Sequence, residues 1–161
     1  MYDQANEIAS WGKSIFVKIP ITNSKGEKTS GLIKKLLEKG AKLEGLKRFR
    51  EAIALYTHSL NLNPNTAEIF KRRGQRYISV RDWDKAIEDL TQAGVHHNFI
   101  KANNLKYTDN LNWAIWYYLG ICYYYIAEFE MALDVFQKSY EYSADNVSLL
   151  ASINWVYNCH R

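Results

Sequence analysis

The fold of this chain is decided by residues 113–146, which read WAIWYYLGICYYYIAEFEMALDVFQKSYEYSADN. Large apolar residues recur there at helical spacing, and the small residues Gly120 and Ala132 interrupt them. A glycine inside a helix costs about 1 kcal/mol relative to alanine, so Gly120 needs a structural reason. We expect a close crossing of two helices, where a larger side chain would hold them apart. The pattern is carried by Trp116, Leu119, Gly120, Tyr123, Ala132, Phe136 and Ser139.

The same arrangement occurs twice more upstream. Gly40 and Gly74 lie 34 positions apart, and so do Ala52 and Ala86. Gly120 follows Gly74 by 46 positions, which indicates an insertion of about 12 residues between the second and third copies. The further matching positions are Leu36, Leu43, Tyr56, Ser59 and Pro64 in the first copy, and Phe70, Tyr77, Leu90 and Ala93 in the second.

This spacing and these residue types resemble the tetratricopeptide repeat (TPR), a helix pair of about 34 residues. The resemblance covers about residues 33–160 and implies an all-α fold, a right-handed solenoid of three helix-turn-helix repeats at about 33–66, 67–98 and 113–146. Two positions depart from the pattern: Lys39 stands where leucine is usual, and Asn98 replaces the terminal proline. The runs KRRGQRYIS (71–79) and IWYYLG (115–120) further resemble a bacterial group of small TPR proteins of ill-defined function, which implies a repeat layout but no activity.

The repeats predict six helices, at about 33–46, 49–62, 66–80, 83–95, 111–126 and 129–142. A seventh, at about 146–158, has the phase of another first helix, with Leu150, Ile153 and Tyr157 at the packing positions. We interpret residues 147–158 as a C-terminal capping helix that covers the last repeat. A chain cut short within a fourth repeat would look the same.

Two segments lie outside the repeats. Residues 1–30 are predicted to form an N-terminal helix, at about 3–16, and a linker arm rich in polar residues and lysine. That helix either caps the first repeat of the TPR domain (31–161) or has a domain-swapped or partner-facing role. The insert at 98–110 is either a tolerated surface loop or a functional element.

Composition and charge bear on the possible classes of function. Net charge is +4, from 21 basic and 17 acidic residues of interspersed sign, so we expect no nucleic-acid partner. No apolar run is long enough to span a membrane, and the N-terminus does not read as a signal peptide, so we expect a soluble, cytoplasmic protein with two free thiols. The adjacent His96 and His97 point in different directions on a helix, and no metal or other cofactor is expected. Cys122 lies among apolar residues without a nearby base, and we expect no enzyme activity.

The resemblance implies a concave groove lined by the first helix of each pair. TPR domains that grip a carboxylate use Lys and Asn there, whereas this chain has Leu37, Ala41 and Arg72 at those places. We therefore expect an adaptor whose cations and tyrosines bind an acidic peptide or helix with apolar anchors. One alternative is a structural protein that self-assembles into a homo-oligomer, in which the N-terminal arm or the unpaired last helix docks on another copy. The other alternative is a helical enzyme. The predicted partner-binding residues are Lys34, Leu37, Lys71, Arg72, Gln75, Ile78, Tyr117, Tyr118, Ile121, Tyr124 and Tyr125.

Overall fold

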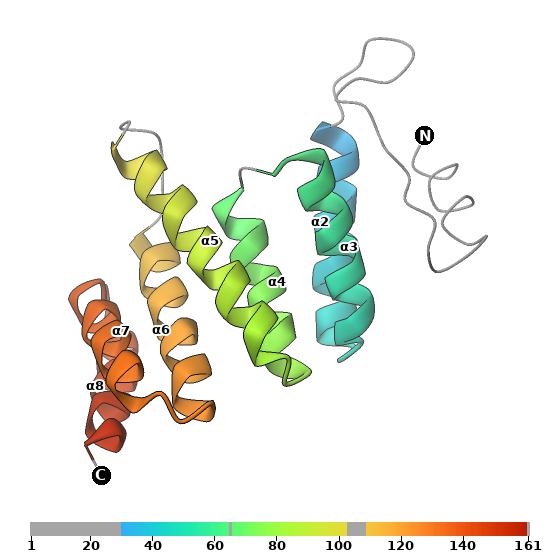
Figure 1. Ribbon diagram of the computed structural model, residues 1–161. Coiled ribbons are helices and arrows are strands. Elements are labelled where there is room, and N and C mark those ends of the chain that lie inside the picture. The colour runs from blue at the N-terminus through green and yellow to red at the C-terminus, as the bar shows by residue number, and fades with distance from the viewer. Residues whose placement is uncertain (1–29, 65, 103–108, 161) are drawn as a thin grey trace. The chain divides into compact units, whose positions relative to one another are not determined.

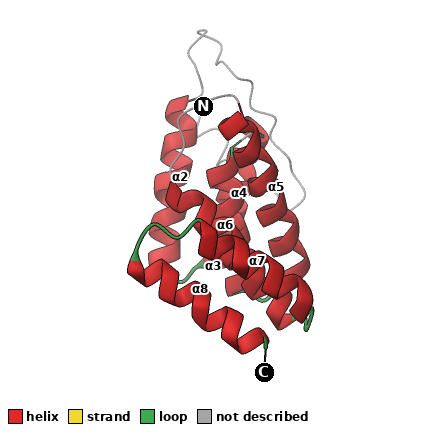
Figure 2. Cartoon of the chain, turned by 90° about the vertical axis from the view of Figure 1, so that its left-hand side faces the viewer, coloured by secondary structure: helices red, strands yellow, loops and turns green. Residues whose placement is uncertain are grey.

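The computed structural model of the chain describes residues 30–64, 66–102 and 109–160 (Figure 1). Throughout this described part the regular elements are α-helices, as Figure 2 shows. The chain divides into two compact units, residues 1–64 and 65–161, and each is considered by itself. The predicted N-terminal helix at 3–16 and its linker lie outside the described residues.

The first unit is a helical hairpin of α2 (Ser30–Gly45) and α3 (Phe49–Leu62). Its two helices pack through apolar side chains spaced as on one face of each helix. The Tyr56 hydroxyl donates a hydrogen bond of 2.6 Å to the Glu44 carboxylate across the hairpin. The buried residues of this interface are Leu32, Leu36, Leu43, Ala52, Tyr56 and Leu60.

The second unit contains five helices, each packed on the next. They are α4 (Ala67–Ser79), α5 (Trp83–Ala102), α6 (Asp109–Tyr125), α7 (Phe129–Glu141) and α8 (Asn146–Cys159). Within this unit α4, α6 and α8 run in one direction, and α5 and α7 run in the other (Figure 1). The predicted order of helix pairs, followed by a last single helix, is confirmed.

The insert differs from the prediction at its start. We expected a helix to end near residue 95 and a loop to begin at Asn98, but α5 continues through Ala102. The loop was predicted because the segment is rich in Asn and Lys. Residues 96–102 contain neither Gly nor Pro, however, and Asn and Lys alone do not end a helix.

Helix α8 packs in a different way from the first helices before it. Leu150, Ile153 and Tyr157, which were expected at packing positions, are exposed. The side of α8 that contacts α7 instead carries the buried Ser148 and Ser152. In the preceding repeats the corresponding positions pack on a second helix, and the described residues include no second helix after α8.

In each hairpin a glycine of the first helix lies against a large side chain 16 positions later. A Cβ added at these glycines would meet that side chain at less than 3 Å, so alanine cannot be accommodated without movement of its neighbour. The added Cβ would lie 2.8 Å from Tyr56 Cε1 at Gly40, 2.9 Å from Leu90 Cγ at Gly74, and 2.6 Å from Phe136 Cε1 at Gly120. The close helix crossing predicted from the sequence is confirmed.

The turns inside the three hairpins also share one backbone geometry. Lys47, Arg81 and Ala127 have φ of 57°, 60° and 65°, in the left-handed region that favours glycine. The amide after each of them donates a hydrogen bond to the carbonyl five residues back, as in Arg48 to Leu43 at 2.9 Å. Each first helix therefore ends in a Schellman motif, whose left-handed residue is here not glycine.

We expect Gly120→Ala to destabilise the second unit by roughly 1–3 kcal/mol, because the added methyl group collides with the buried Phe136 ring. Gly94→Ala is the matched control, since its Cβ would find the nearest side-chain atoms at 3.8 Å. It should stabilise α5 by up to about 1 kcal/mol through helix propensity. Urea unfolding followed by far-UV circular dichroism measures both changes, and an unchanged midpoint for Gly120→Ala would contradict this account.

Ala127→Gly should raise the free energy of unfolding by about 0.5–1 kcal/mol, because glycine adopts the left-handed conformation without the steric cost that alanine has. The same substitution at the exposed, helical Ala54 should instead lower it by about 1 kcal/mol. Opposite signs in thermal or urea unfolding are expected. If both variants lose stability, the positive φ at Ala127 does not carry the steric cost described here.

Candidate functional site

One side of the second unit is built by α4, α6 and α8, where α6 contacts both α4 and α8. Most of the predicted binding residues lie on α4 and α6, where all but the exposed Tyr125 are half-buried. Lys34 and Leu37 lie on α2 in the first unit, and their part in the same surface stays a prediction. The predicted residues on α4 are Lys71, Arg72, Gln75 and Ile78, and those on α6 are Tyr117, Tyr118, Ile121, Tyr124 and Tyr125.

The predicted cations of α4 share a carboxylate. Glu68 Oε1 lies 2.7 Å from Arg72 Nε and 3.2 Å from Lys71 Nζ. Lys71 and Arg72 each stand about one helical turn after Glu68, and such pairs on a helix surface are weak. Together they carry a net charge of +1, so this part of the face is less cationic than Lys71 and Arg72 alone would suggest.

The tyrosines of α6 are held by one another and by α8. Tyr117 stacks on Trp113 with ring centroids 4.8 Å apart, and its hydroxyl accepts a hydrogen bond of 3.1 Å from Trp155 Nε1. Burial raises the pKa of Tyr118, which hydrogen-bonds to Gln75. Tyr124 packs edge-on against Trp155 at 5.0 Å. The aromatic wall is therefore fixed in place, and part of each ring is already used in packing.

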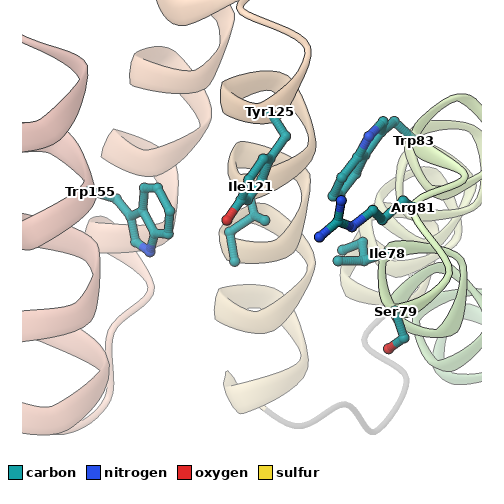
Figure 3. A pocket seen from close by; sticks show the side chains of 7 residues that line it. All are labelled: Ile78, Ser79, Arg81, Trp83, Ile121, Tyr125 and Trp155. Carbon is teal, nitrogen blue, oxygen red and sulfur yellow. The ribbon is translucent and has the colours of Figure 1, made fainter.

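A cleft opens where α4, α5, α6 and α8 meet (Figure 3). It has a volume of about 520 Å³, and aromatic and aliphatic side chains line most of it. Trp83 and Tyr125 stack there with a centroid separation of 4.9 Å and an interplanar angle of 5°. The lining residues are Ile78, Ser79, Arg81, Trp83, Ile121, Tyr125 and Trp155.

Four of these cleft residues were not among the predicted binding residues: Ser79, Arg81, Trp83 and Trp155. Trp155 follows Ile121 by 34 positions, so counting one further repeat along the chain would have found it. Arg81 and Trp83 belong to the turn and to the start of a second helix. The prediction considered only the first helix of each pair, so it did not include these two residues.

Behind this face a buried ion pair joins α4 to α5. Arg73 donates from Nε and Nη2 to the two carboxylate oxygens of Asp89, each at 2.7 Å. Burial raises the pKa of the Asp89 carboxyl, while the bonds from Arg73 oppose that rise. The Arg73 guanidinium also lies 5.9 Å from the Tyr77 ring centroid. Arg73 thus has a different role from its neighbours Lys71 and Arg72, because it holds α4 on α5.

Potential metal-ligating side chains are dispersed in the described part of the chain. No cluster of three or more His, Cys, Asp or Glu side chains is found there. Burial raises the pKa of Cys122 to about 12, so its thiol stays protonated at neutral pH. Over the same residues, none of the helices has the length and apolar character needed to cross a membrane.

The chain resembles proteins that contain tetratricopeptide repeats. No protein-family model matches it. Tetratricopeptide repeat protein 16 of Mus musculus is 26% identical over 97 residues, which are 60% of this chain and 12% of that protein. The BBSome complex member BBS4 of Bos taurus is 26% identical over 112 residues, 70% of this chain and 19% of that protein. The chain therefore spans less than a fifth of the length of these relatives.

Solved structures of tetratricopeptide-repeat domains share its fold. The first such domain of Spaghetti (RPAP3), bound to the HSP90 peptide SRMEEVD, has a TM-score of 0.67 at 17% identity and covers 80% of this chain and 90% of its own. The Sgt2 TPR domain from Aspergillus fumigatus has a TM-score of 0.64 at 22% identity, and the match covers 80% of this chain and 77% of that one. The N-terminal domain of stress-induced protein-1 from C. elegans has a TM-score of 0.67 at 12% identity, and the match covers 87% of this chain and 100% of that one.

Cys122 should resist alkylation in the native protein, because its thiol is buried and its pKa is raised to about 12. Burial also raises the pKa of Cys159, but that side chain is only half-buried and should react slowly at mildly alkaline pH. Mass spectrometry after iodoacetamide treatment should find one adduct in native protein and two in denaturant. Rapid native labelling of Cys122 would show that the thiol is not buried as described.

Proposed function

This chain is a tetratricopeptide-repeat protein by fold, and from that premise we propose that it is a protein-interaction adaptor. Its ligand is a segment of a partner protein that combines acidic residues with an apolar anchor. The observation that carries the proposal is the aromatic cleft of about 520 Å³, which opens on the face formed by α4, α6 and α8. Concave apolar sites with a few polar groups are typical of ligand binding.

The apolar anchor is proposed to enter between Ile78 and Ile121, with the stacked Trp83 and Tyr125 as one wall. Large rigid aromatic side chains offer contact area at low entropic cost, which is why they dominate the energetics of interfaces. Arg81 at the rim supplies a planar guanidinium that can hold a carboxylate through two hydrogen bonds. An apolar side chain next to Asp, Glu or a C-terminal carboxylate fits this combination.

The acidic part of the ligand is assigned to Lys71 and Arg72. Both already pair with Glu68, so a ligand carboxylate has to compete with that residue or add to the cluster. The Arg72–Glu68 pair is partly exposed, and exposed pairs within a helix typically contribute about 0.3–0.5 kcal/mol, so a ligand carboxylate can compete for Arg72. The Lys71 side chain is only 15% exposed and is less accessible to the ligand. A net charge of +1 in the cluster favours an acidic ligand without making the site strongly cationic.

The first Spaghetti domain binds an HSP90 peptide that ends in acidic and apolar residues. Here Leu37, Ala41 and Arg72 stand where a carboxylate clamp would need Lys and Asn. We therefore propose an internal or otherwise unrelated acidic segment as the ligand rather than a chaperone tail. Binding without catalysis, a cytoplasmic location and a bacterial source stay predictions.

The double substitution Lys71→Glu, Arg72→Glu should weaken binding of acidic peptides roughly tenfold or more, because it places like charges opposite the ligand. The probes are short fluorescent synthetic peptides in which one Leu, Phe or Trp is flanked by Asp and Glu. Fluorescence anisotropy measures their Kd. Ile121→Ala should weaken the same peptides through loss of apolar contact in the cleft.

Two control variants separate the site from general charge effects. Glu68→Gln releases Lys71 and Arg72 and should strengthen binding of the acidic peptides. Lys138→Glu on α7 disrupts a similar pair, with Asp134, away from this face and should leave the Kd unchanged. If the double variant and Lys138→Glu lose affinity equally, binding follows net charge and the proposed site is wrong.

A further inference from the structure

The outer side of α8 carries an apolar surface that no described element covers. Four of its side chains are exposed and, at 100° per residue, fall within about 120° of one side of the helix. Val147 is 79% exposed, Leu150 65% and Tyr157 57%, which is high for apolar side chains that lie together. We call this surface the end face; it consists of Val147, Leu150, Ile153 and Tyr157 on α8, with Tyr140 of α7 beside them.

The end face has a hollow next to its projecting residues. An apolar cavity of about 220 Å³ lies between α7 and α8, lined by Gln137, Tyr140, Ile153 and Val156. Leu150 stands one helical turn before Ile153 and projects beside this hollow. The surface therefore offers both a protruding side chain and a place that can receive one, as helices that pack together require.

Helix α8 is uncharged along its whole length. The sequence Asn146–Cys159 contains no Asp, Glu, Lys or Arg. In a two-fold interface a residue near the axis lies next to its own copy, so a charge at that place would meet a like charge. An uncharged apolar helix avoids that repulsion. The same helix offers no ionic feature that would select a charged partner.

We propose that the end face binds a second copy of this chain, with the two α8 helices antiparallel about a two-fold axis near Ile153. Each Leu150 then enters the hollow between α7 and α8 of the other copy. The antiparallel arrangement also brings the N-terminus of each α8, where Asp145 caps the helix, next to the C-terminus of its mate, so that the helix dipoles attract. The contact area is small, and the expected dimer is weak and concentration-dependent.

Sedimentation velocity of the full chain over a range of concentrations tests this proposal. Wild type should shift from monomer to dimer, and Leu150→Asp should raise the dimer Kd about 100-fold or more, because two charges are buried per interface. Leu150 is exposed, so the substitution should leave the fold intact, as circular dichroism can verify. The matched control is Val95→Asp, at an exposed apolar residue of α5, which should leave the dimer Kd unchanged.

A cross-linking experiment gives an independent readout. In a Cys159→Ser background, Ile153→Cys should form an intermolecular disulfide under mild oxidation, because the two-fold axis brings its copies together. The same cysteine introduced at Val95 should not. Wild type that stays monomeric overturns the proposal and leaves the end face to another segment of the chain or to a different protein. A dimer that Leu150→Asp does not weaken overturns it too, because the interface then lies elsewhere.

Discussion

The closeness of the two helices in each hairpin is the constraint on which the remaining structure depends. Gly120 lets α6 approach α7 until its backbone touches the Phe136 ring, and Gly74 does the same for Leu90 on α5. Because the interaxial distance follows from the side chains at the crossing, these contacts fix how deeply the pair interlocks. They also fix the rotation of the first helix about its axis. Because the side of α4 and α6 that carries the glycine packs on the second helix of the pair, residues on other sides of α4 and α6 are the ones that face the cleft.

The sequence was informative where one residue type alone suits a local geometry. Glycine at a helix crossing and the large residue 16 positions later were readable from spacing, so helix order, hairpin pairing and the phase of α4 and α6 could be predicted. Features that depend on partners distant in the chain were not readable. The helical phase assigned Lys71 and Arg72 to the groove and left Arg73 out, but it did not identify Asp89 as the partner of Arg73, because that pairing depends on the register of α5 against α4.

The aromatic cleft shows the same limit. Tyr125 was predicted as a groove residue. Its stacking partner Trp83 is the first residue of α5, and the prediction did not include it because it considered only the first helix of each pair. The exposure of Leu150 was missed for a related reason. Its helical phase was read correctly, but a packing face is buried only if another helix is present to cover it. Helical periodicity indicates which side of a helix is apolar and says nothing of what lies against it.

Helix α8 serves two surfaces at once. Trp155 turns inward to the cleft and to Phe136, while Leu150 and Tyr157 lie on the opposite side of the helix. Association through the end face would therefore leave the cleft open. In a dimer of this kind the two clefts would belong to one particle, and a partner with two acidic segments would gain affinity from holding both.

The common direction of α4, α6 and α8 has a consequence for any elongated ligand. Glu68, Lys71 and Arg72 occupy the early turns of α4, whereas Ile78 and the cleft lie at its far end, close to where α6 also finishes. Lys71 and Arg72 are therefore separated along the helix axes from the apolar cleft, where Arg81 is the one charged lining residue. A peptide bound at the proposed site would therefore place its acidic part near Lys71 and Arg72 and its apolar anchor in the cleft, and reversing its sequence would exchange the two. The proposed site would in this sense be vectorial, because it would distinguish the order of residues in its ligand as well as their composition.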